Sequence, residues 1–147
     1  MTLNQLIETI TEVSQAHKQV KTVFYGDAAE FLSKGSDNVY PAIFFDLNGG
    51  SINNLTSTLD FTFFFADRVL PDQANEQEVQ SDQLSVCYDI VAQFHENDFE
   101  FTLQESVTVN FFVEDTPDYL AGVSATISFD LPYLKDRCQV PTTYNYQ

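Results

Sequence analysis

The stretch TLDFTFFF, residues 58–65, sets the interpretation of the whole sequence because polar and apolar residues alternate along it. Successive side chains of a strand point to opposite faces of a sheet, so this alternation predicts a half-buried antiparallel strand. One face of the sheet is then expected to pack on helices. The apolar row of this strand is Leu59, Phe61, Phe63 and Phe65.

Five further segments have the composition of strands, being short and rich in β-branched and aromatic residues. Pro41 introduces one of them, at a position where a strand needs no backbone donor. Between that strand and residue 58, the polar residues 48–54 predict a turn-rich connection. The five predicted strands are residues 20–25, 42–45, 100–103, 107–114 and 123–131.

Two helices are expected where apolar residues recur every three or four positions, at residues 2–17 and 76–96. A loop with one helical turn is expected at residues 27–32. The predicted order is therefore α-β-β-β-α-β-β-β, and the predicted class is a two-layer α+β domain whose mainly antiparallel sheet packs against the two helices. This single domain takes residues 1–140, and residues 141–147 are expected to form an extended C-terminal tail.

Phe64 and Phe112 point away from the apolar rows of their strands and are expected on the outer face of the sheet. Paired aromatic rings there suit a subunit interface. They equally suit a second small core beneath a loop, and the sequence does not choose between the two. The connections 26–39 and 69–77, like the tail, are longer than an isolated domain needs, and in an oligomer they could reach adjacent subunits.

The charge of the chain excludes some classes of function. Its 147 residues include 22 Asp and Glu against six Lys and Arg, a formal net charge of −16. Electrostatic binding to nucleic-acid phosphates or to anionic lipid is therefore excluded as the main function. No window of 18 uninterrupted apolar residues and no secretory signal is present, so we expect an intracellular protein without a membrane partner. Cys87 and Cys138 are expected to be reduced thiols.

The residue types that carry catalysis or bind metals form no recognisable arrangement in this sequence. It contains no Gly-x-Ser-x-Gly motif, no phosphate-binding glycine loop and no HExxH motif. His95, Glu96, Asp98 and Glu100 could be written as a metal cluster, but they straddle a helix end and a turn without a spacing that fixes ligand geometry. We therefore expect a protein that is not an enzyme, with no catalytic residues, no metal and no cofactor.

Acidic residues dominate the second half of the chain. Between Arg68 and Lys135 there is no Lys or Arg, whereas thirteen Asp or Glu occur. Three interpretations stay open: simple solubility, a negative lining past which DNA slides without sticking, and a surface that imitates DNA. The last would make the chain an acidic interaction protein, such as a DNA-mimic inhibitor of a DNA-binding host protein.

Short motifs lie at the ends of the expected elements or between them: FYGD at 24–27, VYP at 39–41, EVQSD at 78–82 with Asp89, FVED at 112–115, DYLAG at 118–122 and CQVP at 138–141. In this order they resemble small virion proteins of tailed phages, including crAss-like and other phages of Bacteroidota hosts. The order of elements is also similar to the tail-terminator and head-tail connector fold, whose members assemble as rings. The resemblance implies a structural virion protein of the portal-to-tail connection that surrounds a DNA conduit.

The resemblance also implies partners and a location. The partners are copies of the chain, in a ring of on the order of six or twelve, adjacent portal, connector or tail proteins, and DNA that passes without specific binding. The location is the tail or neck of the virion, after synthesis in the host cytoplasm. Unlike surfaces meet in such a ring, so the few basic residues are expected to face acidic ones. The expected subunit interface consists of Phe64, Arg68, Phe112, Glu114, Asp115, Asp118 and Arg137.

Overall fold

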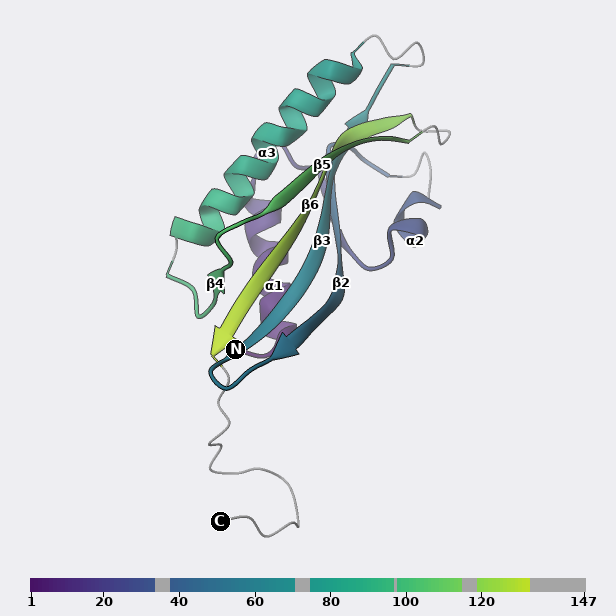
Figure 1. Cartoon of the computed structure of the whole chain (residues 1–147). Coiled ribbons are helices and arrows are strands. Elements are labelled where there is room, and N and C mark those ends of the chain that lie inside the picture. The colour runs from purple at the N-terminus through teal and green to yellow at the C-terminus, as the bar shows by residue number, and fades with distance from the viewer. Residues whose placement is uncertain (34–37, 71–74, 97, 115–118, 133–147) are drawn as a thin grey trace, which may run out of the picture.

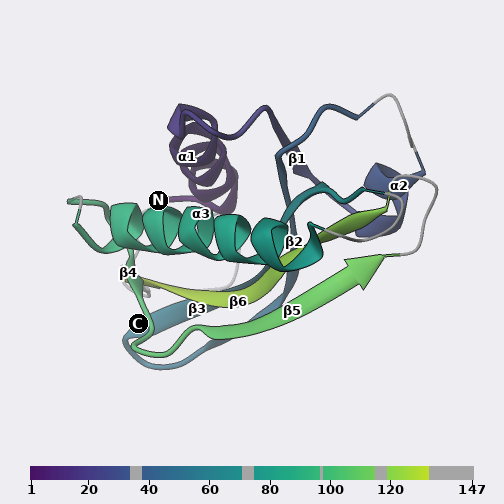
Figure 2. The ribbon, with the colours of Figure 1, turned by 90° about the horizontal axis from the view of Figure 1, so that it is seen from above.

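The structure, a computed structural model, describes residues 1–33, 38–70, 75–96, 98–114 and 119–132. Within them the chain forms helices and a six-stranded sheet, so the predicted α+β class is confirmed (Figure 1). Figure 2 shows α1 and α3 side by side over the sheet. The elements are α1 (Leu3–Ala16), β1 (Thr22–Tyr25), α2 (Ala28–Leu32), β2 (Ala42–Ile52), β3 (Thr56–Arg68), α3 (Glu76–Glu96), β4 (Thr102–Leu103), β5 (Thr108–Glu114) and β6 (Leu120–Pro132).

The sheet is open and mainly antiparallel, as the sequence predicts. β1 pairs in parallel with β2, and the other pairings are antiparallel. The strand order is β1-β2-β3-β6, and both β4 and β5 pair with the remaining edge of β6. β3 and β6 pair along their whole length, from Thr56 opposite Pro132 to Arg68 opposite Leu120. This long pair forms the centre of the sheet.

β2 is longer than the sequence predicts. It continues through residues 48–52, so the expected turn-rich connection there is wrong. The register shifts between Leu47 and Gly49, where Gly49 has a φ of 158° that favours glycine, and this bulge lets the strand run on. The turn comes at Asn53, whose side-chain oxygen accepts the backbone N–H of Thr56.

The two long helices match their predicted positions. α3 begins and ends at the residues that the periodicity predicts, Glu76 and Glu96. Thr2 caps α1, because the Gln5 backbone N–H donates to the Thr2 hydroxyl while the Gln5 side chain accepts the Thr2 backbone N–H. No helix of the described residues is long and apolar enough to cross a membrane.

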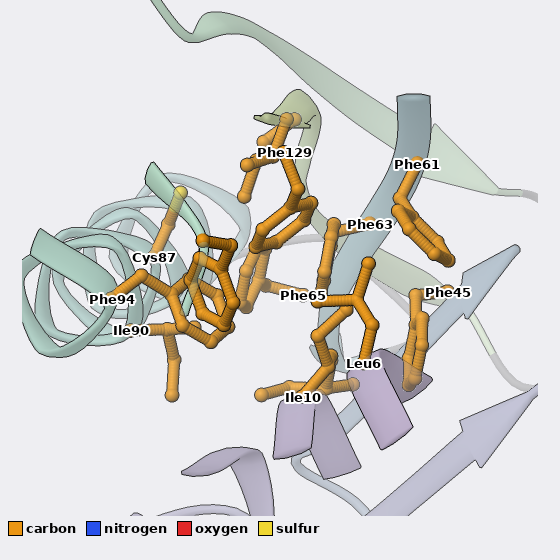
Figure 3. Close-up of a cluster of buried hydrophobic side chains, with 14 of the residues drawn as sticks. Leu6, Ile10, Phe45, Phe61, Phe63, Phe65, Cys87, Ile90, Phe94 and Phe129 are labelled. Atoms are coloured by element: carbon orange, nitrogen blue, oxygen red, sulfur yellow. The ribbon is translucent and has the colours of Figure 1, made fainter. Parts of the chain in front are cut away.

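The main core lies between the sheet and the two long helices (Figure 3). Its centre is the apolar row of β3 that the alternation predicts, in which Phe61, Phe63 and Phe65 are fully buried. The Phe129 ring of β6 lies 5.6 Å from that of Phe61 and 6.4 Å from that of Phe63. Burial of each phenylalanine stabilises the fold by about 2 kcal/mol. The helices close this core with Leu6, Ile10, Val86, Cys87, Ile90 and Phe94.

A second, smaller core lies on the opposite face of the sheet, beneath α2. The Phe31 ring of α2 stacks on Phe44 of β2, with centroids 4.4 Å apart. Phe64 stacks on Phe44 at 4.9 Å, and Phe112 contacts Phe64 edge-on at 5.8 Å. The predicted two-layer arrangement and element order are therefore wrong at this end of the sheet. α2 forms at the helical turn predicted for residues 27–32, lies between β1 and β2, and covers the outer face there.

Away from α2, the outer face of the sheet is polar. The Thr58 hydroxyl donates to Asp130 at 2.6 Å, and the Ser128 hydroxyl donates to Asp60 at 2.6 Å. Both bonds cross from β3 to β6, so hydroxyls and carboxylates alternate over the central strand pair. No helix of the described residues covers this part of the sheet.

Candidate assembly surface

β5 forms an open edge of the sheet. It pairs with β6 on one side, and no other described strand pairs with it. An open edge presents backbone N–H and C=O groups to any chain that lies beside it. α3 lies alongside this strand, since the Gln80 side chain donates to the Phe112 carbonyl at 3.4 Å. A partner could therefore meet both the strand edge and the helix.

An apolar groove of about 310 Å³ lies between α3 and the start of β5. One of its lining residues is Cys87, which also belongs to the main core. Burial raises the pKa of the Cys87 thiol to about 11, so this thiol stays protonated at neutral pH. The groove therefore offers apolar packing rather than a nucleophile. The other lining residues are Tyr88, Val91, Ala92, His95, Val107 and Val109.

Large apolar side chains extend this surface into solvent. Phe111 is 57% exposed, Val113 is 39% exposed and Tyr88 is 62% exposed. Phe111 lies opposite Val123 of β6, which in turn lies opposite Phe65 of the main core. Phe111 and Val113 are therefore on the helix-facing side of the sheet, as the groove is. We call the groove, Phe111 and Val113 together the α3–β5 surface, and its exposed apolar side chains make it the candidate surface for contact with another molecule.

The two aromatic residues that the sequence places at the interface lie on the other face. Phe64 and Phe112 are half-buried in the second core. Of the two interpretations that the sequence leaves open, the structure describes the small core, formed beneath α2. The adjacent pair Phe111-Phe112 is the sequence pattern that indicates an aromatic ring on each face of the sheet, because neighbouring residues on a strand point to opposite faces. One ring enters the second core and the other stays in solvent.

Arg68 is engaged within its own chain. Its guanidinium carbon lies 5.1 Å from the centre of the Tyr40 ring, and it donates to the Asn38 carbonyl at 3.3 Å. Asn38 is buried and donates in turn to the Phe31 carbonyl at 2.8 Å. Arg68 therefore helps to hold the segment before β2 against the second core. Its expected role between subunits stays a prediction.

The other expected interface residues follow β5 or belong to the C-terminal part of the chain. Glu114 is the last residue of β5, and its backbone pairs with that of Leu120. Asp115, Asp118 and Arg137 lie outside the described residues. Their expected contacts between subunits stay predictions.

A polar cleft lies where the end of α1 meets α3. The His17 ring accepts the Gln19 backbone N–H at Nδ1 over 3.1 Å, so Nε2 carries the proton and donates to Asp89 over 2.8 Å. This pair ties the end of α1 to α3. Glu100, one of the residues written as a metal series, binds the N-terminal amino group at 3.1 Å. The described part of the chain holds no group of three or more His, Cys, Asp or Glu placed to bind a metal.

Asp67→Asn is expected to stabilise the protein at neutral pH, by less than about 1 kcal/mol. Burial raises the pKa of Asp67, the Arg68 backbone N–H that donates to it lowers the pKa, and Asp82 raises it again. A carboxyl group whose folded-state pKa is raised costs stability as the pH rises from its ordinary pKa of 3.8 through the pKa of the folded state. The amide keeps the acceptor for Arg68 without the charge.

The advantage of Asp67→Asn should therefore vanish in acid and grow towards neutral pH. Urea unfolding across this range measures it. Asp98→Asn, at an exposed carboxylate, is the matched control and should show little difference at any pH. An Asp67→Asn effect that does not depend on pH would contradict the burial of a charged carboxylate at this position.

Comparison with known proteins identifies no family. No family model matches the chain, and no curated protein matches it. Among solved structures, a mycobacterial sensor histidine kinase, MprB, is 12% identical with a TM-score of 0.27, covering 90% of this chain and 96% of that one. The histidine kinase domain of the blue-light activated histidine kinase of Erythrobacter litoralis EL346 is 11% identical with a TM-score of 0.22. That match covers 88% of this chain and 58% of the kinase chain. Likenesses at these scores carry no argument about fold or function.

Proposed function

We propose that the protein is a structural subunit that joins copies of itself through the α3–β5 surface. The observation that carries the proposal is the open edge of β5 beside an apolar groove, with Phe111 57% exposed on the same side. A subunit that stayed alone would leave both the edge and the apolar side chains in water. A closed ring, of on the order of six or twelve copies, covers them in every subunit.

The finer proposal takes up the resemblance of the sequence motifs to virion proteins of tailed phages. We propose that the ring lies in the portal-to-tail connection, as a tail terminator, a head-tail connector or a neighbouring ring protein with a fold of the tail-terminator type. Its partners are then other copies of the chain and the adjacent portal, connector or tail proteins. It acts by shape and contact, without catalysis or a cofactor.

The polar outer face of the sheet supports a DNA conduit at the centre of this ring. Asp60 and Asp130 stand there at fixed positions on the two central strands, each accepting a hydroxyl hydrogen bond from the other strand. Carboxylates repel a phosphate backbone, whereas hydroxyl groups hold water. DNA would therefore pass such a face without specific binding.

A row of acids on α3 favours a second candidate function, that of an acidic interaction protein such as a DNA-mimic inhibitor. Four exposed carboxylates recur at spacings of four and seven residues, which places them along one side of the helix over about 27 Å. Such a mimic would compete with duplex DNA for a DNA-binding host protein, whereas a ring subunit would not. The four residues are Glu78, Asp82, Asp89 and Glu96.

Mass spectrometry of purified phage particles tests the finer proposal. The protein is expected in the particle at a fixed copy number relative to the portal protein, because a ring that caps or joins the tail contains a set number of subunits. Absence from washed particles, despite its presence in infected cells, would contradict the structural role and leave the interaction protein as the better candidate.

A further inference from the structure

We infer that the groove of the α3–β5 surface is occupied by residues 133–147 of a neighbouring copy, which lie as an added strand beside β5. The inference rests on the proposed self-assembly and names the segment that makes the contact. Three observations support it: the described chain ends at Pro132, the edge of β6 between Pro132 and the groove is occupied, and the segment carries apolar and positively charged residues that match its surroundings there.

The segment begins at a suitable place and is long enough. β6 ends at Pro132, opposite Thr56, and fifteen residues follow it. Fully extended, at up to about 3.3 Å per residue, these residues span roughly 50 Å. Since that length exceeds a strand of the sheet, the segment can leave its own subunit and still lie along β5 of the next.

The way from Pro132 to the groove of the same copy is already occupied. β4 pairs with the last residues of β6, on the side where β5 pairs further along the strand. The next residue, Gln104, donates its backbone N–H to the Ser128 carbonyl at 3.1 Å. Because this part of the chain fills the edge between Pro132 and the groove, the segment of the same copy would have to pass around it. We therefore assign the groove to the segment of another copy.

One face of the segment matches the lining of the groove. In an extended strand, alternate residues share a face, and three of the four residues at positions 134, 136, 138 and 140 are apolar. The groove is lined almost entirely by apolar side chains. β5 would supply the backbone hydrogen bonds, as an open strand edge does when a peptide adds to it. The three apolar residues are Leu134, Cys138 and Val140.

The other face of the segment carries positive charge. Lys135 and Arg137 are two of the six Lys and Arg of a chain with a net charge of −16. Glu96 and Glu105 are exposed. Glu96 follows His95 directly and Glu105 lies two residues before Val107, and both His95 and Val107 line the groove. The cations of one copy would therefore meet carboxylates of the next, which favours this segment over any other part of an acidic chain.

Oxidative cross-linking to the native Cys138 tests the inference. Tyr88→Cys places a thiol at an exposed position of the groove, and Ala92→Cys places a second one turn further along α3. Ser85→Cys is the matched control, because it is exposed on the same helix but lines a separate polar cleft beside Lys18 and Lys21 and not the groove. Cys87 is left in place, since its side chain is buried in the main core and this burial raises the pKa of its thiol.

The groove variants are expected to form a disulfide with Cys138 of another chain at least about tenfold faster than Ser85→Cys, because bound segments raise the local thiol concentration. Peptide mapping identifies the joined residues, and sedimentation of the unoxidised proteins gives their state of assembly. Two results would overturn the inference about the segment but not the proposed self-assembly. One is a disulfide within a single chain, and the other is assembled copies in which the groove variants cross-link no faster than Ser85→Cys. A monomeric wild-type protein would overturn the proposed self-assembly as well.

Discussion

Gly122→Ala is expected to destabilise the fold by about 3 kcal/mol or more. Gly122 lies in β6 opposite Ala66 of β3, and a Cβ added there would overlap the backbone carbonyl of Phe65. Backbone atoms of paired strands cannot move aside as the end of a flexible side chain can. The variant must therefore push β3 and β6 apart beside the second core, to which Ala66 belongs.

Urea unfolding followed by circular dichroism measures this loss. Thr126→Ala changes an exposed residue of the same strand and is the matched control, with an expected cost below about 1 kcal/mol. Because Phe112 of β5 lies opposite Gly122, the variant should also disturb the strand that carries the α3–β5 surface. Equal midpoints for Gly122→Ala and the control would contradict the close approach of β3 to β6.

Phe111→Asp is expected to weaken the association of copies at least about 100-fold while leaving each copy folded. Because Phe111 is 57% exposed, much of its ring packs on nothing within one copy. Losing the burial of this ring at a contact costs about 2–3 kcal/mol, which corresponds to roughly 100-fold in affinity. A carboxylate buried there without a partner adds to the cost.

Leu55→Asp is the matched control for this variant. Leu55 is 79% exposed in the turn between β2 and β3, so it receives the same charge away from the α3–β5 surface. Sedimentation compares the assemblies, and circular dichroism confirms that both variants fold. If Phe111→Asp assembles like the wild type, or if both variants lose assembly equally, the α3–β5 surface is not the contact between copies.

The parts of the fold that depend on periodic burial could be predicted from the sequence. The alternation of residues 58–65 predicts the buried row of β3, and Phe61, Phe63 and Phe65 are fully buried. The apolar stripe of α3 predicts a helix at residues 76–96, and these bounds are confirmed. In both cases the chain packs one face on a core, so the pattern in the sequence follows directly from the structure.

Other parts depend on contacts that no local pattern records. β2 continues through Gly49 because pairing with β3 outweighs the local preference of its polar residues for a turn. The sequence predicts a helical turn at residues 27–32, where α2 forms, but it does not show that Phe31 of this helix packs on Phe44 of β2 and Phe24 of β1. An isolated helix of five residues is unstable, so the presence of α2 depends on this tertiary packing.

For the candidate assembly surface, the sequence predicts which side chains of β5 face the helices but not that they stay exposed. The alternation in β5 predicts that Phe111 and Val113 face the helices, which they do, but these side chains are not covered. Coverage depends on the place of β5 at the edge of the sheet, and a strand's neighbours are set by topology rather than by its own residues. The expected contacts of Asp115, Asp118 and Arg137 stay predictions, because these residues lie outside the described ones.

The most direct test of self-assembly through the α3–β5 surface is the native mass of the purified wild-type chain, measured over a range of protein concentrations beside Phe111→Asp. The wild type is expected as one discrete closed species, a ring of on the order of six or twelve copies, and the variant as single chains. A wild-type protein that has the mass of one chain at every concentration would contradict self-assembly through the α3–β5 surface.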